Sequence, residues 1–232
     1  MINKQTLEVN VLDHGFVKLI DYMGNDHAIA CAARVVEEDW RGNDDIKLLR
    51  YLLKHRHTSP FEHVVLKFHI KAPIFVFRQW HRHRTWSYNE VSARYKQLPE
   101  EYYVPKPEHI GVQSGKNHQG REFTDAEVTD VQTMTSEHIG YVSKEAYKTY
   151  EMFLEGGVPR ELARMILPFN MYSEMYATVD LHNLMHFIEL RLDSHAQYEI
   201  QVYASALLRC MQEVVPVTTN IFVQEVLEKQ DG

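Results

Sequence analysis

The sequence has few cysteines and no excess of positive charge. Only Cys31 and Cys210 occur among its 232 residues, far apart and in apolar stretches. We therefore expect buried free thiols in a reducing cytoplasm, with neither a disulfide framework nor a catalytic thiol. Lys and Arg number 25 against 32 Asp and Glu, so the formal net charge is -7. This balance argues against a general nucleic-acid binder, which usually carries a basic excess over a whole face.

Long apolar runs and glycine-rich phosphate loops are also missing. A membrane-spanning helix needs about 18 or more consecutive apolar residues, and no such run occurs, so we expect no membrane segment. The first ten residues lack the apolar core of a secretory signal, which favours a cytoplasmic protein. Neither common glycine-rich phosphate motif is present, so any phosphate is expected to be held by side chains and helix termini.

Histidine, in contrast, is abundant, with 14 residues. His55 and His57 form a His-x-His pair, as do His81 and His83. His182 and His186 stand four apart on an expected helix. No HExxH motif and no Cys/His quartet accompanies them. We predict no metal site, and a metal-dependent hydrolase built on the histidine pairs stays an alternative.

Hydrophobic periodicity predicts several helices and a few strands that do not alternate with them, which favours an α+β fold. Residues 96–125 hold several Pro and Gly and are predicted to be a surface excursion. Expected strands cover residues 5–20 (with a turn at 13–15), 64–72 and 169–179. Expected helices cover 26–36, 44–54 (capped by Asn43 or Asp44), a segment from Pro73, 126–154, 158–168, 181–192 (capped by Asp180), 195–214 and the tail after Pro216.

Residues 78–95 concentrate the charge chemistry. The stretch contains four Arg, two His and one acid, against the overall sign of the chain. An Arg fork holds a phosphate or carboxylate through two charge-assisted hydrogen bonds, so the stretch predicts an anion site. It also carries Trp80, Trp86, Tyr88 and Tyr95, whose flat surfaces favour a nucleotide over bare phosphate. A non-catalytic nucleotide- or nucleic-acid-binding module is a second alternative.

The motif Arg82-His83-Arg84, followed after seven residues by Ser92, resembles the flavin-dependent thymidylate synthase family. The resemblance extends over nearly the whole chain. Residues 54–63, 71–80, 87–90, 157–160 and 190–197 are similar to that family as well.

The resemblance implies that the chain methylates dUMP to dTMP. The one-carbon unit would come from methylenetetrahydrofolate, and the reducing equivalents from NADPH through FAD. The chain would form a single domain over residues 1–232, with a central, mainly antiparallel sheet packed with helices. It would assemble as a homotetramer whose active sites are shared between subunits.

The resemblance also implies roles for individual residues. Arg191 would polarise the uracil and favour its N3-deprotonated form. His57 would lie near the flavin ring and the folate. The dUMP set is Gln79, Arg82, Glu90, Ser92, Ala93, Arg94, Arg164 and Arg191. The FAD set is His57, Ser59, Arg82, His83, Arg84, Glu90, Asp180, His182 and His186.

Three residues leave alternatives open. Ser92 has no dedicated base beside it, so we expect it to bind substrate rather than act as a nucleophile. Glu90 is expected to pair with Arg94 or to touch ribose or flavin. Many relatives have Asn-x-Arg where this chain has Asp180-Leu181-His182. Because a carboxylate repels a flavin phosphate, Asp180 is expected to cap the helix or bind ribose, and His182 to offer a weaker, pH-dependent contact.

Overall fold

A computed structural model describes residues 7–115, 120–123 and 127–229. Its centre is a five-stranded sheet in which every pair is antiparallel, in the order β1-β2-β3-β7-β4. The strands are β1 (Glu8–Val11), β2 (Gly15–Met23), β3 (Val65–Pro73), β7 (Tyr172–Asp180) and β4 (Ser87–Glu90), with a separate small hairpin of β5 (Val112–Gln113) and β6 (Arg121–Glu122). The predicted α+β class with an antiparallel sheet is confirmed.

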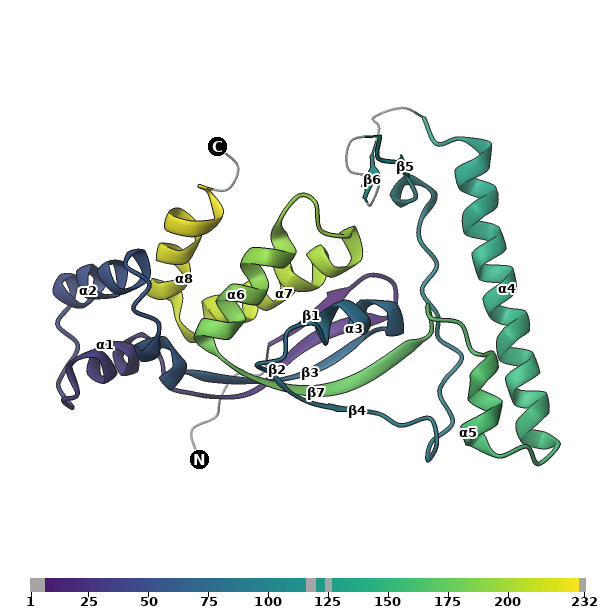
Figure 1. The fold of residues 1–232 in the computed structure, drawn as a ribbon, viewed down its shortest axis with the longest axis horizontal. Coiled ribbons are helices and arrows are strands. Elements are labelled where there is room, and N and C mark those ends of the chain that lie inside the picture. The colour runs from purple at the N-terminus through teal and green to yellow at the C-terminus, as the bar shows by residue number, and fades with distance from the viewer. Residues whose placement is uncertain (1–6, 116–119, 124–126, 230–232) are drawn as a thin grey trace.

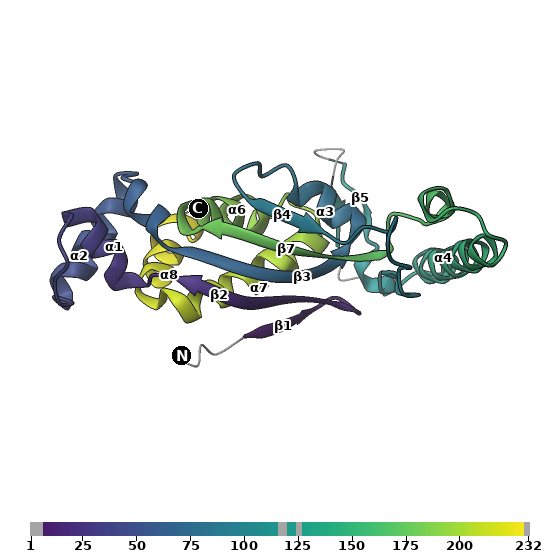
Figure 2. The same ribbon diagram turned by 90° about the horizontal axis from the view of Figure 1, so that it is seen from below.

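Helices cover one face of the sheet, and further helices lie beyond each of its two ends. Figure 1 shows α6 and α7 over the sheet, α1 and α2 at one end, and α4 with α5 at the other, and Figure 2 shows the same order from below. The helices are α1 (Asp26–Arg34), α2 (Asn43–Lys54), α3 (Ile74–Trp80), α4 (Asp130–Glu155), α5 (Arg160–Ala163), α6 (Leu181–Leu192), α7 (Tyr198–Val214) and α8 (Pro216–Phe222). Short 3-10 turns occupy Ser59–His63, Pro107–His109 and Arg164–Ile166, and a π-helical turn occupies Val223–Leu227. None of these described helices is long and apolar enough to cross a membrane.

The core follows from the period-two pattern of β3. Leu66, Phe68 and Ile70 are completely buried under the helices, whereas Lys67 on the opposite face is exposed. This alternation is what a half-buried strand requires. A second, smaller cluster of buried side chains joins α4 and α5 to the segment that enters β7.

The first two helices differ from prediction at their ends. α1 stops at Arg34 rather than Val36, because Val35 adopts the left-handed conformation with φ 57° and closes the helix. The N-cap of α2 is Gly42, with φ 58°, so neither Asn43 nor Asp44 caps it.

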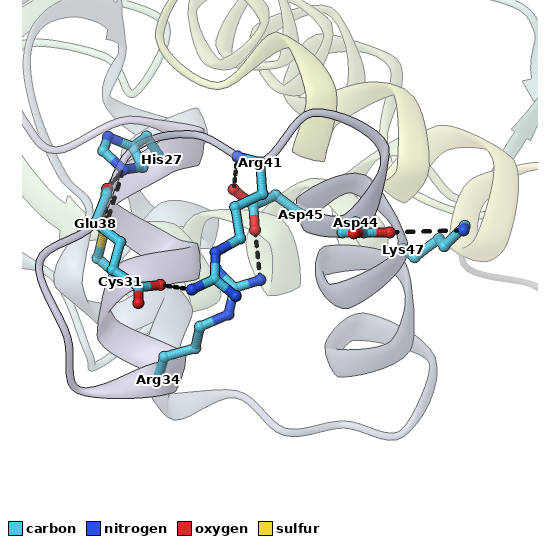
Figure 3. A network of polar contacts seen from close by, with 8 residues as sticks. All are labelled: His27, Cys31, Arg34, Glu38, Arg41, Asp44, Asp45 and Lys47. Carbon is cyan, nitrogen blue, oxygen red and sulfur yellow. Dashed lines mark hydrogen bonds and ion pairs between the residues drawn. The ribbon is translucent and has the colours of Figure 1, made fainter.

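Asp45, in the first turn of α2, ties the intervening loop in place. Its buried carboxylate accepts a hydrogen bond from Arg34 at 2.5 Å and from the backbone N–H of Arg41 at 2.8 Å. Figure 3 shows this network together with Glu38, which pairs with Arg41. Because both partners hold the same buried carboxylate, α1, the loop and α2 are fixed as one unit.

The cysteine prediction is right for Cys210 and wrong for Cys31. Cys210 is completely buried in α7. Cys31 is partly exposed, and its Sγ lies 3.2 Å from His27 Nε2 in the same network (Figure 3). The reason is the orientation of α1, which buries Ile29 and Ala30 instead. Both thiols are free.

Two helix starts in the middle of the chain differ from prediction. α4 begins at Asp130, because Thr129 and Gln132 form a reciprocal capping box there; the predicted start at residue 126 lies outside the described residues. α7 begins at Tyr198 rather than residue 195. The excursion at 96–125 carries a 3-10 turn and the β5–β6 hairpin, and residues 116–119 and 124–125 of it lie outside the described part. The edge strand β4 was not expected.

Candidate active site

The site is built on α6, which starts directly where β7 ends. The Asp180 carboxylate accepts hydrogen bonds from the backbone N–H of Asn183 at 2.9 Å and from its Nδ2 at 2.7 Å. Asp180 is therefore the N-cap that the sequence predicts, and both of its oxygens are occupied. Since residues four apart share a helix face, His182 and His186 lie in one row and Phe187 and Arg191 in the next.

Arg191 meets the Arg82-His83-Arg84 motif at its central residue. Its Nε donates a hydrogen bond to His83 Nε2 at 3.0 Å, and a terminal nitrogen contacts the backbone oxygen of Gln79 at 3.4 Å. His83 is only 8% exposed, and its ring packs on Phe187 with centroids 4.6 Å apart. Two residues that are 108 positions apart in the sequence thus form one unit.

Burial controls the charge state of this unit. Desolvation lowers the pKa of His83 from 6.5 to about 4, and the positive charges of Arg191 and His186 act in the same direction. His83 is therefore neutral near pH 7 and accepts at Nε2. Burial also lowers the pKa of Arg191, and among the described residues no carboxylate offsets its charge. A half-buried cation without an acidic partner is suited to bind an anion.

The free energy of unfolding is expected to decrease as the pH falls from 6.5 toward 4, the window between the unfolded and folded pKa of His83. In that window the unfolded chain takes up the proton first, so protonation favours unfolding. Between about pH 7 and about pH 4.5 the loss due to His83 amounts to about 2 kcal/mol. Urea unfolding of the natural chain and His83→Gln at both pH values measures it. Equal losses in the two proteins would contradict the assignment.

Three of the residues predicted for FAD line one cavity of about 610 Å³. They are His57, from the segment before the first 3-10 turn, and His182 and His186 of α6. The apolar part of the lining includes Leu52, Phe61, Met185 and Phe222. The charged part is Lys54, Arg56 and Lys229 together with Glu189 and Glu225, and Lys229 pairs with Glu225 at 2.5 Å. An apolar surface beside Lys54 and Arg56 suits a ligand with a flat ring system and phosphates, as FAD has. The His186 ring lies 6.1 Å from that of His83, which connects the cavity to Arg191.

The other residues of the FAD set do not line this cavity. Ser59, Arg82 and Arg84 are exposed, and Glu90 lies on the edge strand β4, where it accepts a hydrogen bond from Ser173 Oγ at 2.7 Å. The alternative that pairs Glu90 with Arg94 is wrong, because Arg94 pairs with Glu161 at 3.1 Å.

Six of the eight residues of the dUMP set fall into two groups, and the other two are Arg82 and Glu90, described above. Arg191 lies in α6 and contacts Gln79 of α3, whereas Arg94 lies against α5 through Glu161, and its backbone N–H donates to Ser92 Oγ at 3.3 Å. Ala93 and Arg164 belong to this second group by position, next to Arg94 and directly after α5. Figure 1 shows α5 beside α4 at one end of the molecule, away from α6. No hydrogen bond or ion pair between described residues joins the two groups.

Gln197, for which no role was predicted, contacts Gln79 of the dUMP set. Its Oε1 accepts a hydrogen bond from Gln79 Nε2 at 2.5 Å. The contact crosses from α3 to the residue preceding α7, so it fixes the Gln79 carboxamide. The available signal was its place at the end of segment 190–197, which resembles the family.

The interpretation of the tryptophans as ligand walls is wrong. Trp80 is 0% and Trp86 6% exposed, and Trp80 packs on Phe187 at 4.7 Å between ring centroids. Tyr88 uses its hydroxyl to hold the backbone oxygen of His83 at 2.9 Å. Of these four residues, Tyr95 alone is largely exposed (80%), and its ring centroid lies 5.9 Å from the Arg94 guanidinium carbon. Trp80, Trp86 and Tyr88 therefore hold the Arg82-His83-Arg84 segment in place by packing and hydrogen bonding.

The His55 and His57 rings both pack on Tyr51, whereas His81 and His83 have different neighbours. His81 packs on Phe77 and Tyr88, whereas His83 turns toward Phe187. Within the described ranges, no group of three or more His, Cys, Asp or Glu is arranged to hold a metal ion.

Comparison with known proteins gives a consistent result. Residues 18–217 match the family model described as "Thymidylate synthase complementing protein". A flavin-dependent thymidylate synthase of Wolbachia pipientis is 47% identical, covering 95% of this chain and 78% of the relative. Another from Thermus thermophilus is 49% identical, covering 96% and 80%, and one from Thermotoga neapolitana is 44% identical, covering 94% and 95%.

A solved structure agrees with the sequence relatives. The UMP/dUMP methylase PolB from Streptomyces cacaoi, bound with 5-Br dUMP, superposes with a TM-score of 0.83 at 33% identity. The match covers 94% of this chain and 98% of that one. With this fold, the motif around His83 and a family match over residues 18–217, the chain belongs to the family of flavin-dependent thymidylate synthases.

Proposed function

We propose that this enzyme methylates dUMP to dTMP, with methylenetetrahydrofolate as the one-carbon donor and NADPH, through bound FAD, as the reductant. Membership of the flavin-dependent thymidylate synthase family supports this activity, and so does the similar PolB structure, which is bound with 5-Br dUMP. The observation that carries the proposal is Arg191, a half-buried cation with no carboxylate partner among the described residues.

Arg191 activates the substrate without a covalent bond to the enzyme. Methylation requires electron density at C5 of the uracil, and the N3-deprotonated form supplies it. A preorganised cation stabilises that negative charge in a partly desolvated site. A thiol nucleophile is not required, and burial raises the pKa of Cys210 to about 12, which keeps it protonated.

FAD would be held at the cavity that His57, His182 and His186 line, where Lys54 and Arg56 would be available to bind its phosphates. Ser59, Arg82, His83, Arg84 and Glu90 complete the proposed set, whereas Asp180 acts through its cap on α6. When bound, FAD supplies hydride from NADPH, and the protein orients it. The two free thiols fit a reducing cytoplasm.

The phosphate of dUMP binds to Arg82, Arg94 and Arg164, with Ser92 as a neutral donor. Hydrogen bonds to charged groups contribute about 1.5–3 kcal/mol each, so a few suffice for micromolar affinity, about 8 kcal/mol. Because the two groups of dUMP residues lie apart in one chain, we propose that a homotetramer brings them together across a subunit boundary. Exposed apolar side chains on α4 and after α5 support this, including Val131 (72% exposed) and Met165 (77%).

Ser92→Ala is expected to retain measurable activity, with kcat/KM lowered by about 10- to 10²-fold, because a hydrogen bond to a charged phosphate contributes about 1.5–3 kcal/mol. Among the described residues, the Ser92 hydroxyl accepts a hydrogen bond from the backbone N–H of Arg94 and has no base beside it, which supports a role in binding dUMP rather than in nucleophilic attack. Steady-state kinetics with varied dUMP should show the change mainly in KM. Complete loss of turnover with dUMP and FAD still bound would instead indicate a nucleophile.

Two measurements test the function as a whole. The purified protein should show flavin absorbance, alone or after FAD is added. It should release tritium from 5-tritiated dUMP only when NADPH and methylenetetrahydrofolate are both present. A colourless protein that binds no FAD at micromolar concentration would exclude the proposal. Strongly salt-dependent oligonucleotide binding would favour a nucleic-acid-binding module, and a chelator-resistant metal would favour a hydrolase.

A further inference from the structure

The contact between His83 and Arg191 joins a cation to a neutral acceptor. Guanidinium groups in proteins are usually oriented by carboxylates, which hold the side chain but also cancel most of its charge. Here the Arg191 Nε–H is satisfied by the lone pair of His83 Nε2 at 3.0 Å. An imidazole lone pair orients the guanidinium and leaves its full charge available.

His83 is itself fixed tightly enough to orient another residue. Its backbone N–H donates to Trp80 O at 3.0 Å, and its backbone oxygen accepts from the Tyr88 hydroxyl at 2.9 Å. Its ring lies against Phe187, one turn before Arg191 on the same helix. The position of the acceptor is therefore set by the packing of α3 on α6.

The role requires a particular tautomer. Nε2 can accept only when the ring is neutral and carries its proton on Nδ1. Burial and the nearby charges of Arg191 and His186 lower the pKa of His83 to about 4, which keeps the ring neutral at any pH near 7. The same cation that needs the acceptor thus helps to keep it unprotonated.

We propose that His83 is a positioning residue for Arg191: its Nε2 fixes the guanidinium plane and presents the terminal nitrogens, at full charge, to the uracil. This inference rests on the proposed methylation of dUMP. It assigns His83 to the activation of the substrate, in addition to any contact with the flavin.

Two substitutions at position 83 separate the acceptor atom from the shape of the ring. In His83→Gln, the Oε1 atom can reach the place of Nε2, so the acceptor is kept. In His83→Phe, the ring still packs on Phe187 but has no acceptor. We expect His83→Phe to lower kcat about 10²-fold, the scale of a displaced catalytic group, and His83→Gln to stay within about tenfold of the natural enzyme. Flavin absorbance and the midpoint of thermal unfolding are recorded for both, since a merely structural role would change these instead.

A double-mutant cycle with Arg191→Ala decides whether His83 acts through Arg191. The cycle is measured on dUMP affinity by calorimetry with FAD present, which remains measurable when turnover is lost. His83→Phe should weaken dUMP binding about tenfold in the natural background and less than about twofold in the Arg191→Ala background. If His83→Phe does not fold, His83→Met, which also lacks a strong acceptor, takes its place.

Several results would overturn the proposal. They are equal losses in the Gln and Phe variants, additive effects in the cycle, or loss of flavin from His83→Phe with dUMP affinity unchanged. Absence of dTMP formation by the natural enzyme would reject the proposed function instead. In that case the affinity cycle would still report whether the two side chains are coupled.

Discussion

Replacing Arg191 with alanine is expected to lower kcat by about 10²–10³-fold, the loss seen when one preorganised donor to a developing charge is removed. FAD should remain bound, because the cavity that contains His57, His182 and His186 does not include Arg191. Stopped-flow measurement of dTMP formation gives kcat, and absorbance of the purified variant gives the flavin content.

Arg160→Ala is the matched control, since Arg160 is an exposed arginine at the start of α5 and lies outside both predicted ligand sets. Its kcat should stay close to that of the natural enzyme. If Arg191→Ala lost its flavin while dUMP affinity stayed unchanged, Arg191 would have to be assigned to the cofactor rather than the uracil.

Trp80→Ala is expected to lower the free energy of unfolding by about 3–5 kcal/mol, the range for truncating a large buried aromatic side chain. Trp80 is completely buried, and its ring packs on Trp86, Phe187 and Tyr203. The vacated space lies directly beneath the helix turn that carries Phe187, so the cavity cannot close without moving α6. Urea unfolding followed by circular dichroism measures the loss.

Tyr95→Ala provides the comparison, because Tyr95 belongs to the same stretch but is 80% exposed. Its effect should remain within about 0.5 kcal/mol, as is usual for surface positions. A similar loss in both variants would mean that Trp80 does not support the core as its burial indicates.

The sequence predicted those elements whose local pattern agrees with their tertiary role. Apolar and polar residues alternate in β3 because one face of the strand is buried. The start of α6 was predictable from Asp180, because Asp is a favourable N-cap residue. β4 has no such pattern: it is four residues long at a sheet edge, with no completely buried side chain, and exists because β7 offers hydrogen bonds. Edge strands of this kind are defined by their neighbour.

The site was predictable as a set of residues and not as an arrangement. The family motif placed His83 and Arg191 near the ligands, yet nothing in either segment indicates that they touch, since the contact depends on how α3 packs against α6. The same holds for Gln79 and Gln197. The tryptophans were assigned to the ligand because composition cannot distinguish an aromatic residue in the core from one that lines a surface site.

The junction of β7 and α6 limits where the sequence can accept insertions and deletions during evolution. Asp180 is both the last residue of the strand and the cap of the helix, so no loop separates them. A single residue inserted into the first turn of α6 would rotate everything after it by about 100°. Phe187 and Arg191 would then face away from His83. Insertions and deletions should therefore accumulate elsewhere, as in the segment between β4 and α4, while this junction keeps a constant length.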